Sequence, residues 1–152
     1  MEATTGLTIR SADVADGPAL HHVFVSSIRE IDETFYSSEQ KLAWEAAVSP
    51  DSWPTRILEL TFFVAVRDGE IVGFISWQRS EIEHVYALPN QTGIGSILMR
   101  HAIASMPVGD LALTSSLNAE RFYQKFGFWS VEALLKVRRG VEIPCIRMRR
   151  TA

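Results

Sequence analysis

The sequence predicts a mixed α+β fold with a mostly antiparallel sheet, and three stretches carry this prediction. An Asp-Gly pair between the apolar runs Phe62 to Val66 and Ile71 to Trp77 is typical of a β-hairpin. Glu81 to Met106 changes from strand-like to helical spacing across a glycine turn. The runs Phe128 to Val137 and Val141 to Met148 indicate a closing pair of strands. We expect about six to seven strands flanked by about four helices.

The remaining elements follow from apolar spacing and from helix end signals. They are a strand at Leu7 to Arg10, a helix that runs to about Ile31, a helix from Ser38 to near Pro50, a strand at Leu111 to Thr114, and a helix that Gly127 ends.

Length and composition exclude several classes of protein. The 152 residues, 47% apolar and 22% charged, fit one globular domain over residues 1–152. A net charge of -3 gives no reason to expect nucleic acid. A single cysteine, Cys145, permits no intrachain disulfide, and neither a leader nor a membrane span is evident, so we expect a cytoplasmic protein. The four histidines show no ligand spacing, so we expect no metal.

The C-terminal stretch is locally basic. It contains Lys136, Arg138, Arg139, Arg147, Arg149 and Arg150. Alternation with apolar residues favours solvated strand edges, and the alternative is a basic rim that attracts an anionic cofactor.

A glycine turn stands between the central strand and its helix. Gly93 and Gly95 let backbone N–H groups approach a ligand where the helix directs its positive end, which is typical of a phosphate site. The alternative is a turn in which the glycines only cap and pack. No lysine precedes Ser96, which excludes a Walker loop, and a third glycine is lacking for a Rossmann fingerprint.

Aromatic residues gather around the second predicted helix. Phe35, Tyr36, Trp44 and Trp53 present more aromatic surface than a short helical hairpin needs. They either seal the hairpin onto the sheet or form a pocket wall for a substrate.

Two motifs and the order of elements resemble the GNAT (GCN5-related) N-acetyltransferase family, and in particular a small bacterial subgroup. VYALP followed by GIGSIL resembles the family's strand, turn and helix. AERFYQKFGF, from Ala119 to Phe128, resembles its second motif. The resemblance implies a sheet that splays in the middle around coenzyme A, acetyl-CoA as co-substrate, and a homodimer as one expected partner.

The resemblance also implies the cofactor-binding residues. Those expected to bind the cofactor are Val85, Tyr86, Ala87, Gln91, Thr92, Gly93, Ile94, Gly95, Ser96 and Asn118. The turn after Pro89 is two residues shorter than in the family and lacks its usual cation, so the cradle should rely on backbone N–H groups.

Acetyl transfer needs a general acid and a base, and the sequence offers one candidate for each. Tyr123 stands where the family places a tyrosine that protonates the departing thiolate; packing alone is the alternative. Glu83 is the candidate base because period-two alternation puts it on the same strand face as Val85, with Glu81 one step further away. We expect His84 to point the other way and to pack.

The acceptor is expected to be a small amine. Acidic residues around the aromatic segment favour a cationic amine, with Phe35, Tyr36, Trp44 and Glu81 as candidate contacts. The acidic residues are Asp32, Glu33, Glu39 and Glu45. A small amine, an amino acid derivative or an antibiotic-like compound is expected before a protein N-terminus. The alternative function is a catalytically inactive coenzyme A-binding module that acts through a partner.

Overall fold

A seven-stranded, mostly antiparallel sheet organises the molecule in this computed structural model, which describes residues 6–152. The strands are β1 (Leu7–Ser11), β2 (Thr61–Arg67), β3 (Glu70–Gln78), β4 (Glu81–Ala87), β5 (Leu111–Ser116), β6 (Trp129–Arg138) and β7 (Val141–Arg150). Their spatial order is β1-β2-β3-β4-β5-β7-β6, and only β4 and β5 pair in parallel. The mixed fold expected from the sequence is therefore confirmed.

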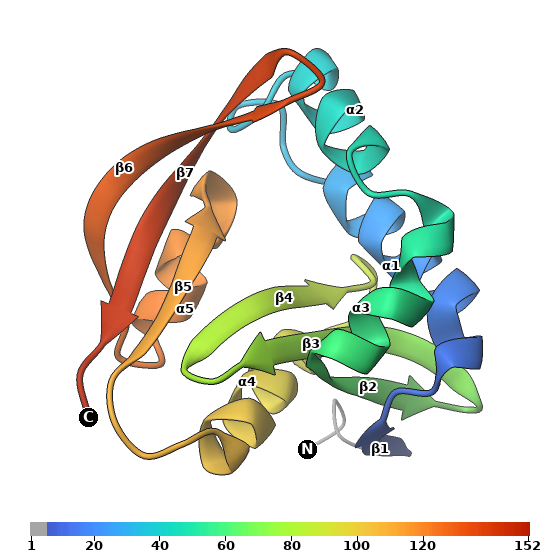
Figure 1. Cartoon of the computed structure of the whole chain (residues 1–152). Helices are drawn as coiled ribbons and strands as arrows, with labels where there is room; N and C mark the ends of the chain where they lie inside the picture. Colours follow the sequence, from blue (N-terminus) through green and yellow to red (C-terminus); the bar gives the residue numbers. More distant parts are fainter. Residues whose placement is uncertain (1–5) are drawn as a thin grey trace.

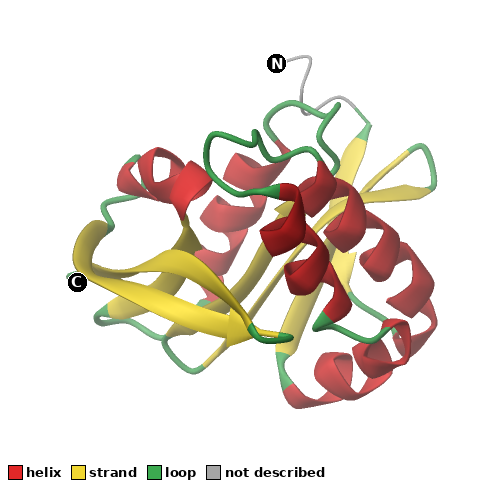
Figure 2. Cartoon of the chain, turned by 90° about the horizontal axis from the view of Figure 1, so that it is seen from above, coloured by secondary structure: helices red, strands yellow, loops and turns green. Residues whose placement is uncertain are grey.

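Helices lie along the sheet on both faces, as the two views show (Figures 1 and 2). Within the described residues, the α-helices are α1 (Gly17–Arg29), α2 (Ser38–Ala46), α3 (Trp53–Glu59), α4 (Ile94–Ser105) and α5 (Glu120–Gln124). Three short 3-10 turns accompany them: η2 (Val14–Asp16), η3 (Pro50–Ser52) and η4 (Leu117–Ala119). The sequence analysis ended the preceding helix near Pro50 and did not predict α3. Pro54 occupies the first turn of α3, where its missing N–H costs nothing.

Neighbouring residues of β3 show which helices cover which face. Phe74 packs against Trp53 of α3, with ring centroids 5.4 Å apart. A Cβ atom added at Gly73 would lie 2.5 Å from Ile94 Cγ2 of α4. Because adjacent strand residues point to opposite faces, α1 and α3 cover one face and α4 covers the other. Gly73 therefore permits close contact between α4 and the sheet.

The β6–β7 hairpin curves away from the rest of the sheet and reaches α2 (Figure 1). The Gln40 side chain donates a hydrogen bond to the Glu142 carbonyl at 3.0 Å, and Arg139 donates one to the Ala46 carbonyl at 3.1 Å. The far end of the hairpin is thus attached to the helical layer on the α1 face.

Replacing Gly73 should loosen the contact between α4 and the sheet. Gly73→Ala puts a methyl group against Ile94 and 3.0 Å from the Tyr86 carbonyl oxygen, so we expect a loss of about 1–3 kcal/mol in the free energy of unfolding, measured with urea. Gly17→Ala is the control, since its nearest contact is Trp53 Cβ at 3.4 Å. Equal stabilities of the two variants would contradict the prediction.

Candidate active site

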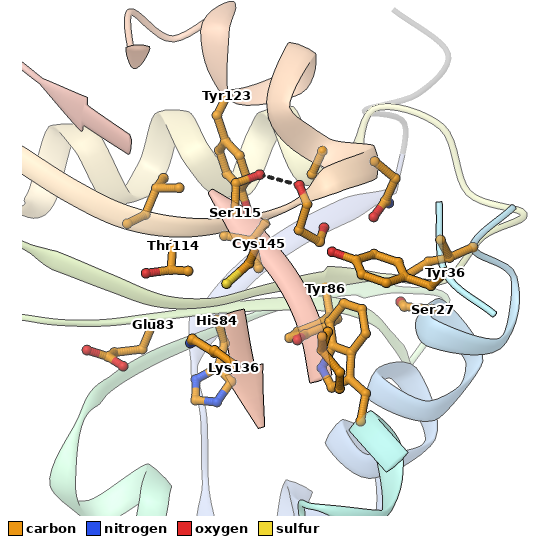
Figure 3. A pocket seen from close by; sticks show the side chains of 18 of the residues that line it. Ser27, Tyr36, Glu83, His84, Tyr86, Thr114, Ser115, Tyr123, Lys136 and Cys145 are labelled. Atoms are coloured by element: carbon orange, nitrogen blue, oxygen red, sulfur yellow. Dashed lines mark hydrogen bonds between the residues drawn. The ribbon is translucent and has the colours of Figure 1, made fainter. Parts of the chain in front are cut away.

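The site begins where β4 and β5 part. Their parallel pairing comprises Glu81 with Ala112 and Ile82 with Leu113, and extends no further. Beyond these pairs lies a cavity of about 400 Å³, lined by α1, the segment before α2, α2, β4, β5, η4, α5, β6 and β7 (Figure 3). The structure therefore has the splayed sheet that the family resemblance implies.

The backbone of β4 presents polar groups to this gap. The Leu88 amide donates to the Val72 carbonyl at 2.8 Å, so alternation along an antiparallel pair turns the backbone groups of Val85 and Ala87 away from β3. Ser27 Oγ donates to the Ala87 carbonyl at 2.5 Å. The N–H and C=O of Val85 and the N–H of Ala87 remain directed at the cavity. Tyr86, between them, contributes its side chain rather than its backbone.

Tyr123 of α5 lines the cavity with an uncommitted hydroxyl. The residue is 8% exposed, and within the described part of the chain its hydroxyl group forms no hydrogen bond. Burial, followed by the neighbouring Tyr86, raises the pKa of Tyr123 well above its usual value. The side chain therefore keeps its proton at neutral pH and can donate it.

A β-bulge in β4 places Glu83. Trp77 pairs with Ile82 and Ser76 pairs with His84, so Glu83 is the extra residue between them. The expected alternation of Glu81, Glu83 and Val85 is therefore interrupted. Glu83 lines the cavity, and partial burial, with Glu81 second, raises the pKa of its carboxyl.

Glu81 lies outside the cavity lining and forms an ion pair. Arg147 of β7 reaches across β5 and donates to both Glu81 oxygens, at 2.5 and 2.7 Å, and to Thr114 Oγ1 at 3.2 Å. These contacts join β4, β5 and β7 at the closed end of the gap. The structure gives Glu81 a role in holding the sheet, which sequence spacing could not show.

His84 packs into the α1 face, as expected, although part of it also borders the cavity. Its ring lies 5.8 Å from Trp53 and 5.6 Å from Phe62, and its Nδ1 shares a hydrogen bond of 2.6 Å with Ser76 Oγ. Burial, followed by the charges of Arg56 and Lys136, lowers the pKa of His84 to about 4.

The turn before α4 has the features of an anion site. Gly93 has φ 80° and no side chain caps the helix, whose first internal bond runs from the Ile97 amide to the Gly93 carbonyl at 3.2 Å. The amides of Ile94, Gly95 and Ser96 precede that bond and have no partner within the helix. Gln91, Thr92 and these residues lie outside the cavity lining, which reaches Pro89.

Both glycines of the turn also have structural reasons. Gly93 adopts a left-handed conformation, and a Cβ at Gly95 would lie 3.1 Å from the Phe122 ring of α5. Packing thus accounts for the glycines, while the free helix start supplies the anion-binding potential.

The structure brings to this turn a cation that the sequence analysis missed. Arg67, at the end of β2, donates a hydrogen bond from Nη1 to the Gln91 side chain at 2.5 Å. The positive charge that the turn itself lacks is therefore supplied by the β2–β3 hairpin. The pairing of β2 with β3 and of β3 with β4 could have indicated it, because these pairings place the end of β2 beside the end of β4.

The aromatic residues divide between the core and the cavity. Tyr36 and Trp44 line the cavity with ring centroids 5.4 Å apart, whereas Trp53 is fully buried and Phe35, 43% exposed, lies outside the lining. The Tyr36 hydroxyl accepts a hydrogen bond from the Leu117 amide at 2.8 Å and donates one to the Pro144 carbonyl at 2.6 Å. Tyr36 thus ties the loop before α2 to the other half of the sheet.

The charged residues that line the cavity are not the acidic residues expected from the sequence. Asp32, Glu33, Glu39 and Glu45 lie outside the lining. Glu45 pairs with Arg29 at 2.8 Å, and Glu33 lies 3.8 Å from Lys41. The charged groups that do line it are Glu30, Glu83, Lys136 and Arg138. The predicted Asn118, which is uncharged, also lines the cavity.

Residues 6–152 contain neither a candidate metal site nor a helix that could span a membrane. No group of histidine, cysteine, aspartate and glutamate side chains in this range could hold a metal ion. None of the helices in this range is long and apolar enough to cross a membrane.

A splayed sheet with an uncapped helix start and a buried tyrosine is the arrangement expected of a coenzyme A-dependent acyltransferase. Residues 33–151 match the family described as Acetyltransferase (GNAT) domain, and the chain belongs to this family. The family resemblance, the fold and the enzyme class expected from the sequence are thereby confirmed.

Individual relatives agree with the family match. An uncharacterised N-acetyltransferase, YafP of Escherichia coli (strain K12), is 27% identical over 128 residues, which cover 83% of each chain. The crystal structure of a GCN5-related N-acetyltransferase from Rhodopseudomonas palustris has a TM-score of 0.89 at 24% identity, over 95% of both chains. PaiA N-acetyltransferase from Thermoplasma acidophilum, solved with coenzyme A, has a TM-score of 0.77 at 21% identity, over 96% of this chain and 99% of that one.

Protonation of His84 should destabilise the fold. Because its folded pKa of about 4 lies below the unfolded value near 6.5, stability is complete above pH 6.5 and falls as pH drops towards 4, by roughly 1.4 kcal/mol per pH unit. Urea unfolding across this range should show a smaller pH slope in His84→Gln. The exposed His22 provides the control: a His22→Gln slope that changed as much would refute the assignment to His84.

Proposed function

We propose that the protein transfers the acetyl group of acetyl-CoA to the amine of a small acceptor by direct attack on the thioester. The observation that carries the proposal is the unpaired edge of β4 beside the Tyr123 hydroxyl in one cavity. A similarly folded protein from Thermoplasma acidophilum was solved with coenzyme A, which supports this choice of donor.

The residues present fit a coenzyme A thioester. The Val85 and Ala87 backbone groups can bind the pantetheine amides as an added strand would, and the start of α4 together with Arg67 can receive the pyrophosphate. Bound acetyl-CoA supplies an activated acetyl group. We assign to the N–H groups of β4 the polarisation of its carbonyl, an effect typically worth about 3 kcal/mol per donor.

Two side chains carry the proton steps in this proposal. Glu83 accepts a proton from the acceptor nitrogen, directly or through water, as the N–C bond forms. Tyr123 donates its phenolic proton to the sulfur as the C–S bond breaks, and its raised pKa keeps that proton available. The proton on Glu83 then returns to the Tyr123 phenolate through solvent, so that atoms and charge balance, with acetylated amine and free thiol as products.

Binding and turnover test the proposal together. Calorimetry should show micromolar binding of acetyl-CoA, and amines should cause thiol release. Tyr123→Phe should lower kcat roughly 100-fold while the dissociation constant for acetyl-CoA stays unchanged, because the ring keeps its packing against Phe122 and Phe128. Full activity in Tyr123→Phe would remove its proposed role, and binding without transfer to any amine would favour the inactive module.

The pH profile tests Glu83. The raised pKa of its carboxyl should place the acidic limb of kcat/KM above the usual titration range of glutamate, with activity lost as pH falls through it. Glu83→Gln should lose this limb and at least about 10²-fold of kcat, while the amine's own titration stays at higher pH. Glu59→Gln, an exposed carboxylate at the end of α3, serves as the control. If the acidic limb of kcat/KM were unchanged in Glu83→Gln, another group would have to be the general base.

A further inference from the structure

Two cations of β6 line the cavity that holds Glu83 and Tyr123. Lys136 and Arg138 line the cavity, whereas the alternating residues Leu135 and Val137 are 60% and 58% exposed on the opposite side of the strand. Alternation along β6 therefore directs both positive charges inward. Lys136 is exposed and Arg138 is partly buried, so both charges border the open side of the cavity.

These cations lie at the end of β6 that reaches the helical layer on the α1 face (Figure 1), because the next residue, Arg139, donates to the Ala46 carbonyl of α2. The charge of Lys136 acts on Glu83 and His84, and that of Arg138 acts on Tyr86. The Tyr86 ring packs against Phe24 of α1, with centroids 5.0 Å apart. Because α4 packs on the opposite face, at Gly73, the sheet separates the two cations from the helix start that can receive the cofactor's pyrophosphate.

Within residues 6–152, neither cation is committed to a carboxylate. Lys136 forms no hydrogen bond or salt bridge there, and Arg138 donates only to the carbonyl of its neighbour Val137, at 3.1 Å. Other cations of the hairpin are used differently: Arg147 pairs with Glu81, and Arg150 donates to the Phe126 carbonyl at 2.7 Å. Lys136 and Arg138 are thus available to an anionic group that enters the cavity.

We propose that the acceptor is a small amine that carries its own carboxylate, as a free amino acid does, with its amine facing Glu83 and its carboxylate facing Lys136 and Arg138. This inference rests on the proposed acetyl transfer and identifies its substrate class. Charge-assisted hydrogen bonds from an ammonium and a guanidinium are the interactions that carboxylates make most strongly. Ile31 and Ile143, with Tyr36 and Trp44, provide an apolar wall for the acceptor's side chain.

Two other classes of acceptor fit the two cations less well than a free amino acid does. A purely cationic polyamine would place positive charge beside two cations, which is unfavourable. A protein N-terminus has an amide where a free amino acid has its carboxylate, so it would leave both cations unpaired.

The test compares each of the twenty common amino acids with its own carboxamide, by thiol release from acetyl-CoA. The amine of a carboxamide is less basic, so intrinsic reactivity at neutral pH favours the carboxamide and opposes the expected result. We expect the best amino acid to exceed its carboxamide in kcat/KM by about tenfold or more, mainly through KM. The double variant Lys136→Met/Arg138→Met should reduce this preference to within about threefold. Arg149→Met, an exposed cation of the same hairpin outside the cavity, should keep it.

Carboxamides that equal or exceed their amino acids in the wild type, or an undiminished preference in the double variant, would overturn the inference. A calorimetric comparison does not depend on turnover: isovalerate should bind the coenzyme A-loaded protein more tightly than isovaleramide, and the double variant should lose the difference. If no amine is acetylated, the proposed function fails, and equal affinities for isovalerate and isovaleramide would then overturn the carboxylate site as well. Turnover confined to amines without a carboxylate would keep the function and refute this substrate class.

Discussion

β4 and β5 hydrogen-bond along two residue pairs, and the architecture of the site depends on how the strands are held apart beyond them. Two contacts connect the two halves of the sheet, one at each end of the gap, and so fix the spacing between them. Arg147 joins β7 to Glu81 of β4 at the closed end, and the Tyr36 hydroxyl joins the loop before α2 to Leu117 and Pro144 at the open end. Both contacts cross from one half of the sheet to the other, so the separation is built into the fold.

A strand edge that is unpaired inside a cavity has an energetic consequence. Val85 and Ala87 are partly buried at the cavity, so a ligand that replaces the missing strand gains hydrogen bonds worth about 0.5–1.5 kcal/mol each. Ser27 already satisfies one of them, the Ala87 carbonyl. The molecule therefore limits how many backbone groups depend on a ligand.

The sequence predicted those features that arise from neighbouring residues. The Asp-Gly hairpin, the turn before α4 and the β6–β7 pair follow from local spacing, and residues 33–151 belong to the family the motifs resembled. The features it missed depend on pairing between distant segments. The bulge at Glu83 requires knowing its partners in β3, and Arg67 reaches Gln91 only because two hairpins lie side by side. Likewise, acidity near the aromatic segment could not show that Glu45 is already paired with Arg29.

The double hydrogen bond of Tyr36 bears on how the site binds a ligand. A hydroxyl that both donates and accepts uses its single proton and a lone pair in fixed directions, so the loop before α2 is tethered to β7 and η4 rather than hinged. An enclosure fixed in this way exists before any ligand arrives. A ligand then meets a wall that is already in place, so its binding does not have to supply the ordering of that loop.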